Sequence, residues 1–170
     1  DLAQDAPEET KRIDRLKNAW IPFGDDNLFP QHLSELSRSA ATHRAILNTK
    51  TTFTMGEGLH TLDESLSEYL TDVNANGDTA DDVVRKVVSD YWTFGNAYLE
   101  VVIGKGYINL YHQDATTARM SKNNDKVLFH PDWANVKRTE SKIKTVDLYP
   151  KFRKAEKGVQ RSVIHFSDYE

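Results

Sequence analysis

The sequence predicts an α+β fold in which amphipathic helices come first and pack on an antiparallel β-sheet of hairpins. Between residues 30 and 94, apolar side chains recur every three to four positions, which is typical of helices. Over residues 97–170, short β-branched runs alternate with polar and glycine turns, which favours antiparallel strands. Residues 1–18 are charged and poor in apolar side chains, so we expect a flexible arm there. A single α+β domain is expected over residues 19–170, helical over 30–94 and mainly strand over 97–170.

The first two helices are predicted from their ends and their apolar stripes. Pro30 suits the first turn of a helix, and Gly56 and Gly58 are expected to end the same helix. A turn at Gly24 and Asn27 precedes it. The second helix has an apolar stripe with helical spacing. Its members are Leu62, Leu66, Tyr69, Leu70 and Val73.

The third helix is the most apolar, and we expect it to pack on the sheet. Thr79 is placed to cap its first turn, with Asp82 three residues later. Valine doublets spaced by four residues favour a helix over a strand in this stretch. Gly95 and Asn96 tolerate a left-handed backbone, so the helix is expected to end there.

A β-hairpin is predicted directly after this helix. The run from Ala97 to Ile103 is apolar and β-branched, the turn contains Gly104 and Gly106, and the second strand runs over 107–111. Glu100 interrupts the apolar run, on the face that also carries Tyr98 and Val102. Further strands are expected around 117–121, 127–129, 142–149 and 163–166.

Composition excludes several chemistries. The chain has no cysteine, so it has no disulfide, no thiolate metal ligand and no cysteine nucleophile. Nucleotide-binding glycine loops, a His-Glu-x-x-His pair and a Gly-x-Ser-x-Gly elbow are missing. No apolar run is long enough to span a membrane. We therefore expect no cofactor, no catalytic residue and no membrane partner. Because the chain begins at Asp1 rather than at Met, we expect a fragment or a processed product.

Three passages resemble one protein family in their order and spacing. They are an entry segment over 20–30, a glycine pair after the first helix, and the helix–strand junction over 94–101. The residues that carry the similarity are Trp20, Gly24, Asn27, Pro30, Gly56, Gly58, Gly95, Asn96, Ala97 and Glu100. Together these passages resemble the portal proteins of tailed bacteriophages and prophages, over roughly residues 20–118.

The resemblance implies a structural role without enzymatic activity. Portal subunits form a homo-oligomeric ring, usually of twelve copies, at one vertex of the capsid. Double-stranded DNA passes through the channel during packaging and ejection. This chain would be the N-terminal wing region, which contacts neighbouring subunits and the capsid shell protein. Terminase and the head–tail adaptor would bind regions outside this chain. The expected location is the virion, with assembly in the host cytoplasm.

Charge is distributed unevenly along the chain. Residues 1–118 contain 10 Lys and Arg against 19 Asp and Glu, whereas residues 119–170 contain 12 against 7. Opposite charge on two flanks suits head-to-tail packing of subunits. The candidate basic interaction face comprises Lys137, Arg138, Lys142 and Lys144. The alternative interpretation of these side chains is a solvated, lysine-rich surface.

Two other functions remain open. Asp132, Glu140 and Lys142 resemble the acidic pair and lysine of metal-dependent nucleases, in which the carboxylates hold Mg²⁺. The spacing between the two acids is short, and the segment between them does not resemble a strand.

A non-enzymatic nucleic-acid-binding module is the second alternative, with aromatic side chains exposed for base stacking. Its candidates are Tyr107, Tyr111, Phe129 and Trp133, for which core packing is the competing explanation. The fragments His112-x-Asp114 and His130-x-Asp132 each supply only two of the three or more ligands that a metal site needs.

Overall fold

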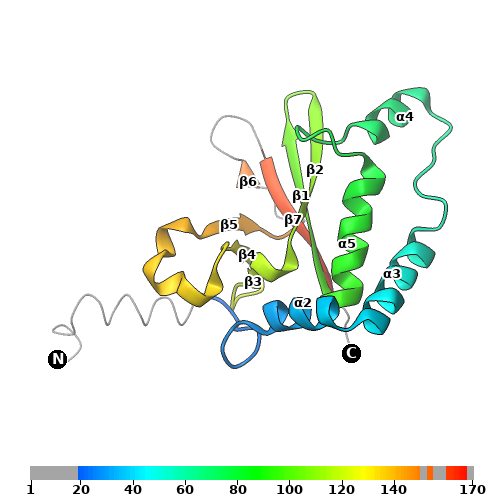
Figure 1. The fold of residues 1–170 in the computed structure, drawn as a ribbon. Coiled ribbons are helices and arrows are strands. Elements are labelled where there is room, and N and C mark those ends of the chain that lie inside the picture. Colours follow the sequence, from blue (N-terminus) through cyan, green and yellow to red (C-terminus); the bar gives the residue numbers. More distant parts are fainter. Residues whose placement is uncertain (1–18, 150–152, 155–159, 168–170) are drawn as a thin grey trace, which may run out of the picture.

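The computed structural model describes residues 19–149, 153–154 and 160–167 (Figure 1). It confirms an α+β fold in which the helices precede the strands. Helix α5 lies between the strands and the outer helices (Figure 1). The predicted arm, residues 1–18, lies outside the described residues.

The predicted first helix is in fact two helices. Helix α2 spans Phe29–Ser39 and helix α3 spans Ala41–Met55, and Ala40 between them has an extended backbone. Pro30 stands in the first turn of α2, as predicted. The prediction of one helix was wrong because no proline or glycine marks the break.

Helix α4 spans Glu64–Thr71, and Asp63 caps it by accepting a hydrogen bond from the backbone N–H of Leu66. The predicted stripe is buried only at its C-terminal end. Val73 is inaccessible to solvent, whereas Leu62 and Leu66 are exposed.

Helix α5 spans Ala80–Phe94 and has the predicted ends. Thr79 and Asp82 form a capping box, in which each side chain accepts from the other residue's backbone N–H. Gly95 ends the helix in the left-handed conformation, at φ 65°. Val83 and Val87 are buried, and α5 packs on β1 and β2. The valine doublets therefore belong to a helix that covers a sheet, as predicted.

The larger sheet has the order β2-β1-β7-β6, and its assigned pairings are antiparallel. Strand β1 spans Asn96–Gly104 and forms the predicted hairpin with β2, Tyr107–Gln113. The other neighbour of β1 is β7, Gln160–Ser167. Strand β6, Arg153–Lys154, pairs with the start of β7. The central strand thus pairs with a segment from the far end of the sequence.

A second, three-stranded sheet has the order β3-β4-β5. Its strands are β3, Ala118–Met120, β4, Lys126–Phe129, and β5, Lys144–Asp147. The sequence predicted one sheet, but the β1–β2 hairpin does not pair with β3 in the structure. The two sheets meet where Leu148 forms a parallel bridge to Val163 of β7.

In the part of the chain that the structure describes, three short 3-10 helices connect strands. Helix η1 spans Ala115–Thr117, η2 spans Trp133–Arg138 and η3 spans Glu140–Lys142. The helices η2 and η3 form the lobe on the left of Figure 1. A core cluster lies between the sheets and contains Tyr98, Ala115, Ala118, Val127, Phe129, Val146 and Val163. A second core cluster includes residues of η2 and contains Trp20, Leu128, Trp133 and Val136.

Candidate functional site

The entry segment attaches to the second sheet. Trp20 is buried, its ring lies 5.1 Å from that of Trp133, and its backbone bridges to Ser121. Gly24 has φ 86°, and a Cβ placed there would lie 2.8 Å from the Cβ of Phe29. The turn at Gly24 therefore requires glycine for both its conformation and its close packing.

Asn27 and Arg119 form a lock between segments 92 residues apart in the sequence. Asn27 is one of two non-glycine residues with positive φ among the described residues, at 62°. Its Oδ1 accepts from the Nε of Arg119 at 2.7 Å and from the backbone N–H of Phe23 at 3.0 Å. Asparagine suits this position because it tolerates the left-handed backbone and offers a side-chain acceptor.

Arg119 is buried, and its hydrogen bonds to the described residues include no carboxylate. Its guanidinium donates to the carbonyl oxygens of Asn27, Thr116 and Ala118 and to the side-chain oxygens of Asn27 and Gln31. Burial lowers the pKa of Arg119 to about 10. The sequence analysis missed this residue, although an arginine between the apolar residues of a short strand is a detectable signal of a buried charge.

The glycine pair and Gly95 stand where helices end. Gly56 has φ 55° and Gly58 has φ 89°, directly after α3. A side chain on Gly58 would clash with the carboxylate of Asp81, which accepts the backbone N–H of Leu59 at 2.9 Å. Each glycine therefore adopts the positive-φ conformation by which the backbone leaves the helix.

Glu100 is the most buried carboxylate of the described residues, with an exposed fraction of 1%. It accepts from Lys144 Nζ at 3.0 Å, from Arg161 Nη1 at 3.1 Å and from Gln113 Nε2. These partners come from β5, β7 and β2. Glu100 thus ties three other strands to β1 through charge-assisted hydrogen bonds.

Asn96 and Ala97 are the first two residues of β1 and also stabilise the sheet. Ala97 is fully buried, and Asn96 Oδ1 lies 2.8 Å from Nε2 of His165. The His165 ring stacks on Tyr98 with centroids 4.7 Å apart and an interplanar angle of 4°. Burial lowers the pKa of His165. These residues join β1 to β7.

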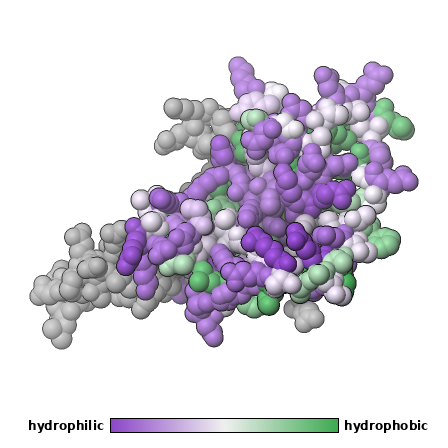
Figure 2. Space-filling model, viewed as in Figure 1, coloured by the Kyte–Doolittle hydropathy of each residue, from purple (hydrophilic) through white to green (hydrophobic). Residues whose placement is uncertain are grey.

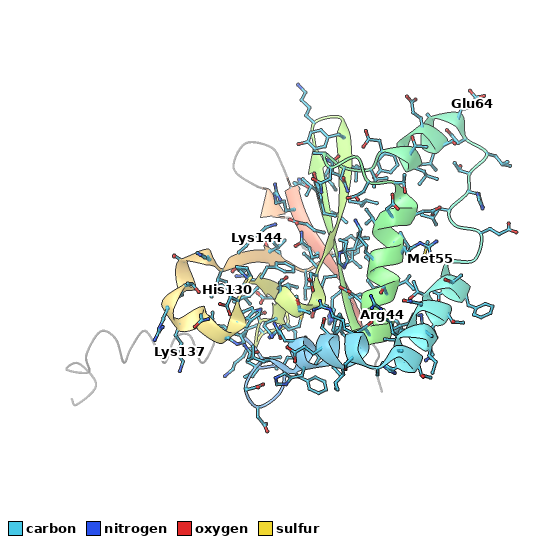
Figure 3. The ribbon with its side chains drawn as sticks, viewed as in Figure 1. Arg44, Met55, Glu64, His130, Lys137 and Lys144 are labelled. Carbon is cyan, nitrogen blue, oxygen red and sulfur yellow. The ribbon has the colours of Figure 1, made fainter. Side chains whose placement is uncertain are left out.

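The basic candidates divide into two groups. Lys137 and Arg138 on η2 and Lys142 on η3 are exposed. Figure 3 shows Lys137 on the outer side of the lobe. Lys144 is different, because its ammonium group bonds both oxygens of the buried Glu100. Lys144 therefore belongs to the fold of this chain, and we retain only the other three as a basic face.

The nuclease candidates lie on the 3-10 helices and not on adjacent strands. Asp132 caps η2, with its carboxylate held by the backbone and side chain of Asn135, and this contact lowers its pKa. Glu140 begins η3, and Lys142 ends it. Within the residues that the structure describes, no group of three His, Cys, Asp or Glu side chains is arranged to hold a metal ion.

The two His-x-Asp fragments have separate structural contacts. His112 Nε2 lies 2.8 Å from Asp90 of α5, while Asp114 caps η1. His130 is buried, with Nδ1 accepting from the backbone N–H of Asp132 and Nε2 lying 3.0 Å from Thr139. Neither fragment brings its two side chains to one point.

The stacking candidates are mostly in the interior. Phe129 and Trp133 are buried, and Tyr111 is half-buried on β2. Tyr107 alone of the four is exposed, at the hairpin tip. The aromatic platform of the nucleic-acid-binding alternative is thus not formed by these four residues, and core packing accounts for Phe129 and Trp133.

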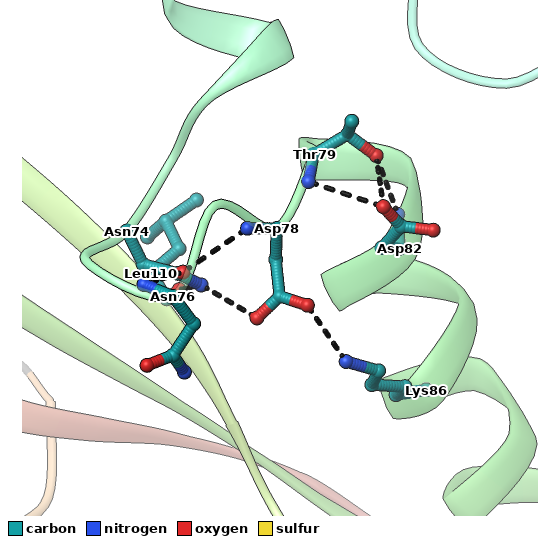
Figure 4. A network of polar contacts seen from close by, with 7 residues as sticks. All are labelled: Asn74, Asn76, Asp78, Thr79, Asp82, Lys86 and Leu110. Atoms are coloured by element: carbon teal, nitrogen blue, oxygen red, sulfur yellow. Dashed lines mark hydrogen bonds and ion pairs between the residues drawn. The ribbon is translucent and has the colours of Figure 1, made fainter.

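A polar network fixes the turn before α5 (Figure 4). Buried Asn74 donates to Asp78 Oδ2 at 3.0 Å and to the carbonyl of Leu110 at 2.8 Å. Lys86 donates to Asp78 Oδ1 at 2.9 Å. The hydrogen bonds from Lys86 and Asn74 lower the pKa of Asp78. This network joins the turn between α4 and α5 to β2.

A cleft of about 580 Å³ lies between the sheets. Phe23, Tyr98, Arg119, Tyr149 and His165 are among its lining residues. Its two cationic or titratable nitrogen groups, Arg119 and His165, already bond protein oxygens, so the cleft presents aromatic and apolar surface more than charge.

Large apolar side chains are exposed on the outer side of the helices. Phe53 is 80% exposed and Leu62 fully exposed, and Figure 2 shows apolar patches along this edge. We define the outer helical face as Ile46, Phe53, Leu59, Leu62 and Leu66. Leu62 and Leu66 belong to the predicted apolar stripe of the second helix but are exposed, because periodicity shows that a helix has an apolar face but not what covers it.

Comparison with known protein families and with curated proteins finds no match to this chain. No helix among the described residues is long and apolar enough to cross a lipid bilayer.

Proposed function

We propose that this chain is part of the wing region of a portal subunit, a structural component of a ring through which double-stranded DNA enters and leaves a phage capsid. One observation carries the proposal. Eight of the ten residues on which the family resemblance rests lie at helix ends, in a tight turn or at the start of β1. The side chains of Trp20, Asn27, Asn96 and Glu100 make contacts that stabilise the fold.

These contacts support a structural role for the motif residues. Left-handed backbone occurs at Gly24, Asn27, Gly56, Gly58 and Gly95. Residues other than glycine and asparagine are strained at such positions. A family that shares a fold without sharing a reaction is expected to share this kind of residue.

The nuclease alternative is less well supported by the geometry. Its proposed metal ligands, Asp132 and Glu140, lie on successive 3-10 helices, and Asp132 already accepts hydrogen bonds from Asn135. Carboxylates that hold one Mg²⁺ ion must converge on it. The proposal therefore assigns no catalytic residue.

Electron microscopy of the natural protein that contains this sequence, purified without DNA, tests the proposal. Rings with a central hole and about twelvefold symmetry are expected. A uniform monomer or dimer over a wide range of protein concentration and salt would contradict it. Plasmid nicking that requires Mg²⁺ and is lost in Glu140→Ala, but not in Glu57→Ala, would favour the nuclease instead.

A further inference from the structure

We propose that the outer helical face binds the η2–η3 lobe of a second copy of this chain, in a head-to-tail contact. This inference rests on the proposed function, because it names the surfaces through which neighbouring subunits meet. It depends on three observations: exposed apolar side chains, a negatively charged segment around those of them that lie at residues 59–66, and a group of basic side chains on the far side of the molecule.

The first observation is the apolar surface itself. Ile46 and Phe53 are seven residues apart on α3, so they lie on one side of that helix. The opposite side packs on α5 and buries Thr51 and Met55. Leu59 and Leu62 continue the exposed surface through the connection to α4. Large side chains gathered in this way mark an interaction surface more often than isolated exposed residues do.

The second observation is charge. Residues 57–82 contain eight carboxylates and no lysine or arginine. These are Glu57, Asp63, Glu64, Glu68, Asp72, Asp78, Asp81 and Asp82. Several of them cap helices or fix turns, but Glu64 and Glu68 are exposed on α4 beside Leu62 and Leu66. A partner for this surface must therefore offer positive charge next to apolar contacts.

The third observation identifies the occupant. Lys137, Arg138 and Lys142 lie on the η2–η3 lobe, next to exposed Pro131 and Ala134. Figure 3 shows Lys137 at one end of the molecule and Glu64 at the other. The chain thus carries a surface and its complement on opposite sides, which is the arrangement of a heterologous, head-to-tail contact.

The same charges argue against other occupants. A two-fold dimer through the outer helical face would place carboxylates against carboxylates, and like charges across an interface are costly. The same carboxylates disfavour nucleic acid at the α4 end of this face, because its backbone is negative. A second copy that presents η2 and η3 offers basic side chains to the carboxylates of this edge.

Cysteine cross-linking tests the contact with little background, because the chain has no cysteine of its own. Two variants, Leu62→Cys and Ala134→Cys, are oxidised separately and as a mixture at low salt. The mixture should give a disulfide-linked dimer, whereas each variant alone should not. The double variant should give a ladder of longer species. Asp25→Cys, exposed in the loop before α2, is the matched control and should not pair with Leu62→Cys.

Charge reversal is a second test of the same contact. Reversing the lobe (Lys137→Glu, Arg138→Glu, Lys142→Glu) or the helix (Glu64→Lys, Glu68→Lys) should each lower the cross-linking yield at least about tenfold. Mixing the lobe-reversed and helix-reversed proteins should restore the yield, because each then offers the other a complementary surface. Lys144 is left unchanged because it pairs with Glu100. Circular dichroism checks that every variant is folded.

The outcomes separate this inference from the proposed function. Efficient homodimers of Leu62→Cys alone, or no cross-linked species in the mixture at high protein concentration, would overturn the head-to-tail contact. Rings whose subunits meet through other surfaces would keep the portal proposal and overturn this one. Head-to-tail chains from a natural protein that never closes into rings would keep this contact and overturn the portal proposal.

Discussion

Replacement of Asn27 tests whether the lock with Arg119 stabilises the fold. Alanine at this position keeps φ near 62° and loses the acceptor for two donors. The left-handed backbone costs alanine about 1 kcal/mol. The bond from Phe23 is worth about 0.5 kcal/mol and the charged bond from Arg119 about 1.5 kcal/mol, taking the lower values because Asn27 is half-buried. The expected loss is therefore about 3 kcal/mol.

A series of variants separates these contributions. Asn27→Gly removes the backbone strain and should lose about 2 kcal/mol. Asn27→Asp keeps both acceptors and places a carboxylate on the buried guanidinium, so it should be as stable as the parent or more stable. Asn124→Ala is the matched control, since exposed Asn124 has φ 52° and should lose only the backbone contribution of about 1 kcal/mol.

Urea unfolding followed by tryptophan fluorescence measures these differences, because Trp20 and Trp133 pack together near the lock. In thermal unfolding, a loss of 3 kcal/mol corresponds to a lower Tm by about 6–12 °C for a domain of this size. The reasoning is refuted if Asn27→Ala loses no more stability than Asn124→Ala, or if Asn27→Asp is the least stable of the series.

Three further predictions follow from the buried and capping charges. Glu100→Gln should lower the free energy of unfolding by about 2 kcal/mol, and Lys144→Met should lower it by about 1 kcal/mol. Both losses are modest because the two cations, Lys144 and Arg161, are half-exposed and regain water when the ion pair is lost. Equal effects of the two variants in urea titrations would contradict this prediction. Burial lowers the pKa of His165 from 6.5, so unfolding takes up a proton and stability should fall as pH falls below 6.5; His165→Gln should flatten that slope in unfolding measured from pH 7 to 5. The pKa values of Asp78 and Asp82 are depressed, so both residues contribute stability above the unfolded pKa of 3.8, and this stability should be lost as the pH falls below 3.8. If the stability of Asp78→Asn depends on pH as that of the parent does, the turn network is not responsible.

Local signals were sufficient to predict several elements. Thr79 and Asp82 predicted the start of α5, Gly95 predicted its end, and the glycine turn predicted the β1–β2 hairpin. Each of these signals acts within a few residues, so the sequence alone carries it. The division of the first helix at Ala40 has no such signal, because alanine is the residue most compatible with a helix.

Long-range pairing could not be predicted in this way. Nothing near Glu100 indicates that Lys144 and Arg161 will reach it, and nothing near Asn27 indicates Arg119. For the same reason Lys144 was predicted to lie on an interaction face, although its partner is within the chain. Periodicity likewise could not show that Phe53 and Leu62 face outward, since the partner that covers an apolar side chain is not encoded in its spacing.

The pairing order of the larger sheet has a consequence for synthesis on the ribosome. Strand β1 obtains its second neighbour only when β7 has been made, and Glu100 lies opposite Val163 in that pairing. Until then the hairpin presents an unpaired, valine-rich edge to other nascent chains. Contacts between distant segments also slow folding, because a long loop must close first. A product that stops before Gln160 is therefore expected to aggregate rather than to persist as a smaller folded unit.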